Sequence, residues 1–306
     1  MDASLVGTVL GRYALVRLIG VGGMGAVYEA MHQDLGRRAA IKTLHERSLA
    51  DPGARQRFLQ EGQAAARIRH ANVADVYDVA IDGDHPYLVM ELLEGEDLSR
   101  LIERHGPLSV QRAADLLLPV VAAVSAAHAQ GVLHRDLKPQ NIFLCKVGAG
   151  VRPKVLDFGI SKLDAPPAGL PLTGSGFLLG TPHYMSPEQA QGAKDLDARS
   201  DQYSLGVVLY ECVTGCRPMQ GVAPHSLLHR IVQGDFPAPR QLMPGLPGPF
   251  EALILKAMAR RSGSRFPTTR AFGAALLGYA SDRLRDDYAA ELVGDHPDAP
   301  AERAEA

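Results

Sequence analysis

The sequence has few cysteines and almost no net charge, and both features exclude classes of protein. Its 306 residues include three cysteines, an odd and sparse set that argues against a disulfide framework. Cys212 and Cys216 lie in a helical pattern without a nearby His or Cys, so we expect small buried side chains rather than a metal site. The formal net charge of −2 gives no basic field that would attract nucleic acid or a membrane surface.

A secretion signal and a membrane span are not expected either. Met1 to Val9 lacks a basic start and has only a short apolar run. Leu116 to Leu133 carries no formal charge and approaches the length of a bilayer span, but it is rich in alanine and contains Pro119 and Gly131. A buried helix is therefore the better interpretation. With 46% hydrophobic and 22% charged residues, we expect a soluble, cytoplasmic protein with no membrane segment.

The first part of the chain is rich in predicted strands. Alternating and apolar runs predict five strands, bounded by turns such as Asp34-Leu35-Gly36. These strands are expected at 13–19, 26–31, 38–44, 73–79 and 87–92. One helix is expected over 52–69, with Asp51 as its N-cap and Pro52 at its first position.

After Gly95 the pattern changes to long helices. They are expected at 110–130, 200–214, 249–260 and 267–280, with Gly131 and Gly215 closing the first two and Ser200 or Asp201 capping the second. Residues 281–306 are rich in Ala, Asp, Glu and Arg with little apolar content, so we expect a disordered or frayed tail. The sequence contains no internal repeats. The pattern predicts an α+β protein with a small strand-rich lobe and a larger helical one.

The most informative stretch runs from His134 to Asn141 and reads H-R-D-L-K-P-Q-N, followed later by Asp157-Phe158-Gly159. It sets a carboxylate that can act as a base beside oxygen ligands for a divalent cation, the equipment of phosphoryl transfer from ATP to a hydroxyl. The pair of motifs resembles the protein kinases, and Lys138 is typical of their serine/threonine branch. The details of the glycine loop and of Met185 to Gln189 look most like bacterial members.

The resemblance implies a protein-kinase-like bilobal fold. Its small N-lobe would be a five-stranded antiparallel sheet with one helix, over 13–94, and its larger, mainly helical C-lobe would span 95–280. Residues 1–12 would be a lead into the domain, and residues 281–306 the tail.

The resemblance also implies roles in the two motifs. Asp136 would be the catalytic base, and Lys138 would offset charge on the transferring group. Asn141 and Asp157 would hold Mg²⁺, or Mn²⁺ in its place. His134 would pack against Phe158 in support of the loop.

Gly20 to Val27 fits G-x-G-x-x-G-x-V, a pattern shared with dinucleotide-binding domains. Here strand continues on both sides of the glycines, which favours a flap over ATP phosphates instead of a helix start. Lys42 ends an apolar strand and would neutralise phosphate charge, held there by Glu61 on the predicted helix. Contacts with the nucleotide are then implied for Ile19, Gly20, Val21, Gly22, Gly23, Met24, Gly25, Ala26, Val27, Lys42, Glu91 and Leu93. The last two would bind the adenine edge through their backbone, next to Met90 as gatekeeper.

The segment from Asp157 to Glu188 would form the activation segment. Its end, Gly180 to Glu188, matches G-T-x-x-Y-x-x-P-E, with Ser186 in place of the usual alanine. The resemblance implies that Thr181 reaches the catalytic loop, that Glu188 forms a buried ion pair with Arg265, and that Asp201 binds the catalytic-loop backbone. Arg135 would receive a phosphate carried by Thr173 or Ser175, the two candidates for autophosphorylation.

These features predict an ATP-dependent protein serine/threonine kinase that acts on Ser/Thr hydroxyls of protein substrates and forms a homodimer for trans-autophosphorylation. Two alternatives remain beside it. One is a catalytically weak kinase-fold scaffold, which would be expected to lack part of the motif set. The other is a small-molecule kinase of related fold, which would not be expected to share the Met185 to Glu188 pattern. The physiological substrate, the activating signal and the presence of a sensor region beyond the domain cannot be read from these residues.

Overall fold

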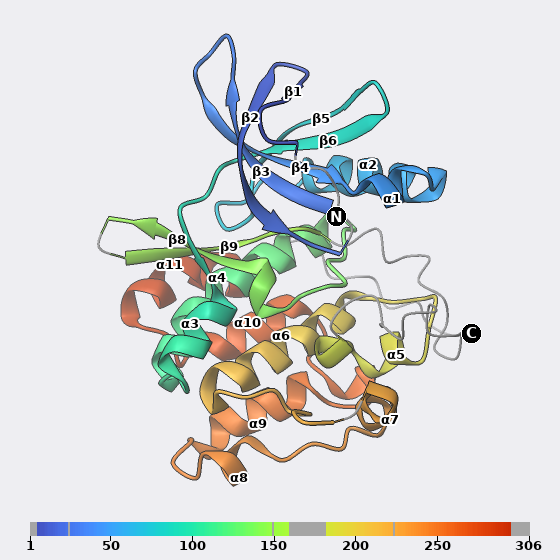
Figure 1. The fold of residues 1–306 in the computed structure, drawn as a ribbon. Helices are drawn as coiled ribbons and strands as arrows, with labels where there is room; N and C mark the ends of the chain where they lie inside the picture. Colours follow the sequence, from blue (N-terminus) through green and yellow to red (C-terminus); the bar gives the residue numbers. More distant parts are fainter. Residues whose placement is uncertain (1–4, 24, 149, 159–181, 223, 295–306) are drawn as a thin grey trace, which may run out of the picture.

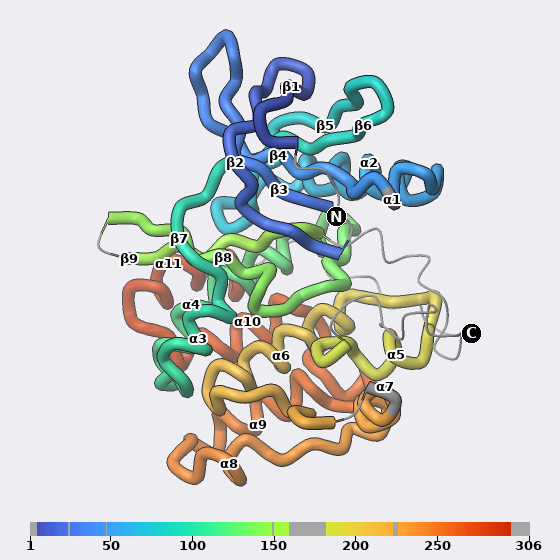
Figure 2. Tube along the Cα trace, viewed as in Figure 1, coloured from blue at the N-terminus to red at the C-terminus, as the bar shows by residue number. Residues whose placement is uncertain are grey.

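The computed structural model describes residues 5–23, 25–148, 150–158, 182–222 and 224–294. Two lobes are stacked on each other (Figure 1), a small one built around a sheet and a larger one built from helices. The chain crosses from the upper to the lower lobe between β6 (His85–Met90) and β7 (Gly95–Asp97), a passage that can be followed along the trace in Figure 2. This arrangement confirms the predicted α+β bilobal fold.

The small lobe is an antiparallel sheet in the order β1-β2-β3-β4-β6-β5. The strands not yet given are β1 (Val9–Leu10), β2 (Tyr13–Val21), β3 (Gly25–His32), β4 (Arg38–Leu44) and β5 (Val76–Asp82). The expectation of five strands was wrong by one, because β1 has only two residues and is too short for an alternating pattern. It also lies within the expected lead of residues 1–12.

Two helices cover this lobe instead of the single one expected: α1 (Glu46–Leu49) and α2 (Pro52–Ala65). The Asp51 side chain accepts a hydrogen bond from Gly53 N and Pro52 opens α2, as the sequence predicted. A Cβ on Gly62 would overlap the Leu88 side chain, so glycine allows α2 to lie close against β6. This close approach fixes the distance between α2 and the sheet.

The large lobe begins with β7 and is mainly helical. A second, small sheet pairs β7 with β8 (Ile142–Val147) and β9 (Gly150–Val155). The longer helices are α3 (Leu98–His105), α4 (Val110–Ala129), α6 (Ala198–Thr214), α7 (Pro224–Gln233), α9 (Gly248–Ala257), α10 (Thr269–Leu277) and α11 (Asp282–Val293). Short helical turns are η1 (Pro139–Asn141), η3 (Pro182–Tyr184), α5 (Pro187–Ala190), α8 (Pro239–Leu242) and η4 (Ser262–Ser264).

Helices α4 and α6 form the centre of the large lobe, and their residues dominate its main apolar cluster. Helix α4 is long and apolar enough to cross a membrane, but 67% of an apolar stretch of 18 residues within it is buried inside the domain. The apolar run noted in the sequence is thus core. Helix α6 ends at Gly215 in the left-handed conformation, as expected, but its N-cap is Asp197, not Ser200 or Asp201. The two expected caps are instead buried inside the helix.

The expectation of a disordered tail was wrong for residues 282–293, which form α11. Leu284 and Tyr288 pack against the main cluster and Leu292 is 3% exposed within it. These three side chains recur every fourth residue and so share one face of a helix. An otherwise polar segment can therefore bury a narrow apolar stripe against α4 and α10.

Candidate active site

The glycine-rich loop joins β2 to β3 as a hairpin, so strand flanks it on both sides as predicted. Gly22 N donates to Gly25 O at 2.8 Å and closes the turn. A Cβ on Gly25 would overlap the backbone carbonyl of Thr43, which explains glycine at that position. The side chain of His45 contacts Gly22 O at 2.8 Å and ties the loop to the end of β4. Met24 lies outside the described residues.

Lys42 on β4 meets two carboxylates beneath this loop. Its Nζ lies 2.8 Å from Asp157 Oδ1 and 3.6 Å from Glu61 Oε1. The predicted contact with Glu61 is present, and the contact with Asp157 was not anticipated. Burial alone would lower the pKa of Lys42, but the two carboxylates outweigh it and raise that pKa. The ammonium is therefore held charged between α2 and the residue that follows β9.

Three polar side chains of the 134–141 loop converge. Lys138 Nζ lies 2.8 Å from Asp136 Oδ2, and Asn141 Nδ2 donates to the backbone carbonyl of Asp136 at 2.8 Å. The first contact orients the Asp136 carboxylate, and the second uses the amide nitrogen of Asn141 and leaves the side-chain oxygen of Asn141 for another contact. The turn η1 supplies the geometry, because Pro139 begins it and Asn141 ends it.

His134 is fully buried and packs against Phe158, the contact the sequence predicted, with ring centroids 4.8 Å apart and ring planes tilted by 47°. Asp136 N donates to its Nδ1, so Nε2 carries the proton and donates to Leu156 O at 2.9 Å. Burial lowers the pKa of His134, which keeps the ring neutral. The imidazole thus braces the loop against the residues before Asp157.

One carboxylate from α6 holds the loop backbone. Asp201 accepts from His134 N and Arg135 N, both at 2.7 Å, and lies 2.7 Å from His128 Nε2. Burial would raise the pKa of Asp201, but these hydrogen bonds outweigh it and lower that pKa. Arg135 has φ 64° and Asp157 has φ 47°, a left-handed conformation that non-glycine residues rarely adopt. The Asp201 hydrogen bonds offset that cost at Arg135.

The cleft beside the interlobe connection is apolar. It is lined by Ile19, Val27, Ala40, Val73, Met90, Leu92, Leu93, Phe143 and Val155, among others. Glu91 N donates to Asp75 O at 3.0 Å. Of the two backbone groups of Glu91, only the carbonyl therefore remains for an adenine edge. The Glu91 carboxylate accepts a hydrogen bond from Asp75 N at 2.8 Å and forms an ion pair with Lys154, two contacts that the sequence did not suggest.

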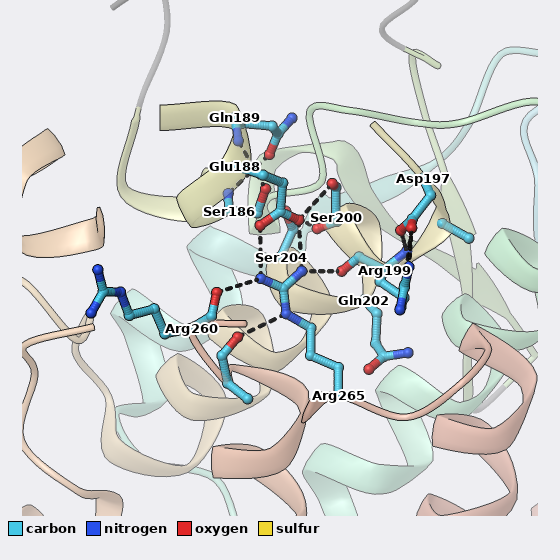
Figure 3. Close-up of polar contacts among 12 residues, drawn as sticks. Ser186, Glu188, Gln189, Asp197, Arg199, Ser200, Gln202, Ser204, Arg260 and Arg265 are labelled. Atoms are coloured by element: carbon cyan, nitrogen blue, oxygen red, sulfur yellow. Dashed lines mark hydrogen bonds and ion pairs between the residues drawn. The ribbon is translucent and has the colours of Figure 1, made fainter. Parts of the chain in front are cut away.

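Farther from the cleft, Glu188 and Arg265 form the predicted buried ion pair (Figure 3). The guanidinium donates to both carboxylate oxygens, at 2.7 and 2.8 Å, and its side chain is 0% exposed. It also donates to the carbonyls of Ala259 and Arg199. Burial would raise the pKa of Glu188, but Arg265 outweighs it and lowers that pKa. The pair fastens the start of α5 to the segment before α10.

Two residues of this region were missed. Ser186 caps α5, and Gln189 closes a capping box by accepting from Ser186 N. Gln189 also donates to Arg135 O at 3.0 Å and so joins α5 to the catalytic loop. The sequence carried the signal, since Ser186 and Gln189 fit the S-x-x-Q pattern of a capping box. Gly159, Thr173, Ser175 and Thr181 lie outside the described residues.

Comparison with known proteins agrees with this geometry. The family model described as "Protein kinase domain" matches residues 13–270. The serine/threonine-protein kinase Pkn1 of Myxococcus xanthus is 39% identical over 92% of this chain, which covers 40% of that protein. PknA of Mycobacterium tuberculosis is 41% identical over 85% of this chain, which covers 60% of that protein.

Among solved structures, the kinase domain of PknI from Mycobacterium tuberculosis is similar, with a TM-score of 0.69 and 27% identity. That match covers 91% of this chain and all of the kinase-domain chain, 100%. The chain thus spans less than two thirds of the curated relatives but the whole of a solved kinase domain. Given the family match over most of its length and the cleft described above, the chain belongs to the protein kinase domain family.

Proposed function

We propose that the chain transfers the γ-phosphoryl group of ATP to serine or threonine hydroxyls of proteins. One observation carries the proposal: Lys42 Nζ lies 2.8 Å from Asp157 Oδ1 and 3.6 Å from Glu61 Oε1, so three elements meet in one cleft. An ion pair between this strand lysine and a helix glutamate is one of the parts that phosphoryl transfer by protein kinases requires. A scaffold without transferase activity would have no need to maintain this charge cluster.

The roles follow from charge and position. Asp136 accepts the proton of the serine or threonine hydroxyl, and the oxygen of that hydroxyl bonds to the γ-phosphorus. The bond between the γ-phosphorus and the oxygen that bridges it to the β-phosphate breaks, and ADP leaves. Lys138, 2.8 Å from the Asp136 carboxylate, offsets charge on the transferring group. Lys42 neutralises the α- and β-phosphates. Positioning and electrostatic stabilisation account for most of the rate in such a reaction.

Asn141 and Asp157 would hold a divalent cation. The Asn141 amide nitrogen donates to Asp136 O, which leaves its oxygen as ligand, and the Asp157 carboxylate is 39% exposed toward the cleft. Hard oxygen donors suit Mg²⁺, or Mn²⁺ in its place, and few protein ligands are needed when phosphates supply the rest. When bound, the cation would neutralise phosphate charge. The described residues contain no cluster of three or more His, Cys, Asp or Glu that would compete for it.

The adenine would lie between the apolar side chains of the cleft, with the Glu91 carbonyl and the Leu93 backbone at its edge. Ile19 and Val27 line the same cleft from the flanks of the glycine loop. The backbone of residues 20–25 would then lie over the phosphates. The same loop is tied to β4 through His45.

A protein acceptor is supported by α5 and its attachments. The capping box at Ser186, the link from Gln189 to Arg135 and the Glu188–Arg265 pair give the segment after Thr181 a fixed seat beside the catalytic loop. Relatives that carry the name serine/threonine-protein kinase match most of this chain. Thr181 would reach the loop near Asp136.

Phosphorylation of the activation segment would regulate this activity. Thr173 or Ser175 would carry the phosphate and Arg135 would receive it, in a homodimer that phosphorylates in trans. Incubation with Mg-ATP followed by mass mapping should find phosphate between Leu170 and Thr181. An active enzyme with an unmodified segment would contradict this part of the proposal.

The boundaries of the catalytic domain would be residues 13–280, with 13–94 as N-lobe and 95–280 as C-lobe. Partners would be soluble proteins with accessible serine or threonine residues, in the cytoplasm. Comparing the activity of 13–280 with that of 13–294, which adds α11, tests the C-terminal boundary.

The deciding experiment compares wild type with Asp136→Asn, using labelled ATP and a generic basic protein as acceptor. We expect a loss of at least about 100-fold in kcat for the variant, the usual contribution of a positioned general base. Equal transfer by both proteins would show that the base is wrongly assigned. A parallel screen of small-molecule hydroxyl acceptors covers the alternative acceptor class, and nucleotide binding without any transfer would indicate a scaffold.

A further inference from the structure

Helix α11 begins after the last residue that the family model matches, yet it contacts the loop between α2 and β5, residues 66–75. Tyr288 Oη donates to Asn72 Oδ1 at 2.7 Å. Glu291 Oε1 lies 3.0 Å from His70 Nε2. Two side chains of α11 therefore bind two side chains of the 66–75 loop.

The protonation of His70 follows from its other nitrogen. Asn72 N donates to His70 Nδ1 at 3.0 Å, so Nδ1 is an acceptor and the ring proton is on Nε2. Nε2 then donates to Glu291. The contact with Asn72 N thus selects the tautomer with the proton on Nε2, which is the tautomer that can donate to Glu291 of α11.

Asn72 passes this contact on to β9. Asn72 is 2% exposed, and its Nδ2 donates to Pro153 O at 2.8 Å. Its backbone oxygen accepts from Val155 N at 2.8 Å, and Ala74 N donates to Val155 O at 3.0 Å. Val155 ends β9, and Asp157 follows it in the candidate cation site. The loop therefore fixes the strand end from which Asp157 projects.

Helix α11 is itself firmly seated. A Cβ on Gly273 of α10 would come within 2.8 Å of Leu292, so the two helices pack closely. Arg270 Nε donates to Glu291 O at 3.1 Å, and Ser281 N donates to Asp115 Oδ1 at 2.7 Å. The helix can thus serve as a rigid support for the loop.

We propose that Tyr288 and Glu291 are positioning residues of the phosphotransfer site, which act through His70 and Asn72 on the orientation of Asp157. The inference rests on the proposed function only in naming the reaction that the site serves. Its physical content is a chain of hydrogen bonds from α11 to β9. Without the Tyr288 hydroxyl the buried Asn72 side-chain oxygen loses its partner, and the loop holds the strand end less rigidly through the hydrogen bonds that remain.

The test measures the binding of a fluorescent ADP analogue with and without Mg²⁺, together with hydrogen exchange. Tyr288→Phe keeps the ring and removes the hydroxyl. We expect the Mg²⁺-dependent gain in affinity to fall by about tenfold, a usual effect of residues behind a metal ligand, while affinity without Mg²⁺ is unchanged. The amides of Ala74 and Val155 should exchange faster. Glu291→Ala should act in the same direction, and Glu291→Gln, which keeps an acceptor for His70, should restore wild-type behaviour.

The matched control is Arg283→Ala, on the same helix, whose side chain is 89% exposed and should change neither quantity. If Tyr288→Phe lowers the affinities with and without Mg²⁺ by the same factor and also lowers the melting temperature, the residue is merely structural and the inference is overturned. It is also overturned if the Mg²⁺-dependent gain is unchanged. The two proposals can fail separately. If the wild type phosphorylates no protein, while Tyr288→Phe still reduces the Mg²⁺-dependent gain in ADP affinity, the proposed function is refuted and this inference stands.

Discussion

Breaking the ion pair between Glu188 and Arg265 should be among the most destabilising single changes in the large lobe. The Arg265 side chain is 0% exposed and the Glu188 side chain 20% exposed, and two hydrogen bonds of 2.7 and 2.8 Å join them. Glu188→Ala leaves the guanidinium with the carbonyls of Ala259 and Arg199, but without a counter-charge. Truncating one partner of a buried pair costs about 3–5 kcal/mol. Because these carbonyls remain, we expect the lower end, about 3 kcal/mol.

The measurement is urea unfolding of wild type, Glu188→Ala, Arg265→Met and the double variant. The double-mutant cycle should give a coupling energy of about 2–3 kcal/mol. Arg283→Ala breaks an exposed pair with Asp287 and serves as control, with an expected change below about 0.5 kcal/mol. A loss below about 1 kcal/mol for Glu188→Ala, at an unchanged m-value, would refute the reasoning that burial makes this pair strong.

The same pair gives a pH dependence with a definite sign. The pKa of Glu188 is lowered from its ordinary value of 4.5 in the folded protein. Its contribution to stability is therefore fully present above about pH 4.5 and is lost as pH falls through the lowered folded pKa. Glu188→Ala should remove this part of the acid destabilisation, which parallel urea titrations at several pH values would measure.

Three further predictions follow from single positions. Gly62→Ala should lower the free energy of unfolding by about 1–3 kcal/mol and raise KM for ATP, because the new methyl overlaps Leu88 and pushes α2, with Glu61, away from Lys42. Urea unfolding and initial-rate measurements test this prediction, and an unchanged KM would contradict it. Burial lowers the pKa of His134 from 6.5, so the unfolded chain takes up a proton that the fold resists, and stability should fall as pH drops below about 6.5. His134→Gln should flatten that slope between pH 7.5 and 5.5, and equal slopes would exclude His134 as its source. Ser186→Ala should cost about 1 kcal/mol through loss of the α5 cap, measured by urea unfolding, and no change would mean that the capping box is not formed in solution.

Much of the fold was predictable because its elements are long and their patterns are strong. The strand at 38–44 and the helix α4 match the predicted ranges within a residue. The prediction for residues 281–306 was wrong over 282–293 because it relied on their polar composition and not on the spacing of their apolar residues. Leu284, Tyr288 and Leu292 recur every fourth residue, a helical stripe that was visible in the sequence.

The candidate site was predictable where short motifs set spacing, as in the loop from His134 to Asn141. The side-chain contacts of Glu91 and Asn72 were not, because their partners Lys154, Tyr288 and Pro153 are distant in sequence and match no motif. The path of the chain alone brings them together. Ser186 lies between these cases, since its capping box with Gln189 is a local pattern in the sequence but its position is one where the family pattern has alanine.

The hydrogen bonds from Asp201 to the backbone of His134 and Arg135 also bear on the order in which the molecule folds. The left-handed conformation of Arg135 carries an energetic cost that is offset only when α6 has docked, because the acceptor of its backbone N–H, Asp201, belongs to that helix. A partly folded chain would therefore have no formed catalytic loop and would not consume ATP. Native-state hydrogen exchange should show the two loop amides opening together with the centre of α6 and not with the small lobe. The proposed phosphoryl transfer would then require a completed large lobe.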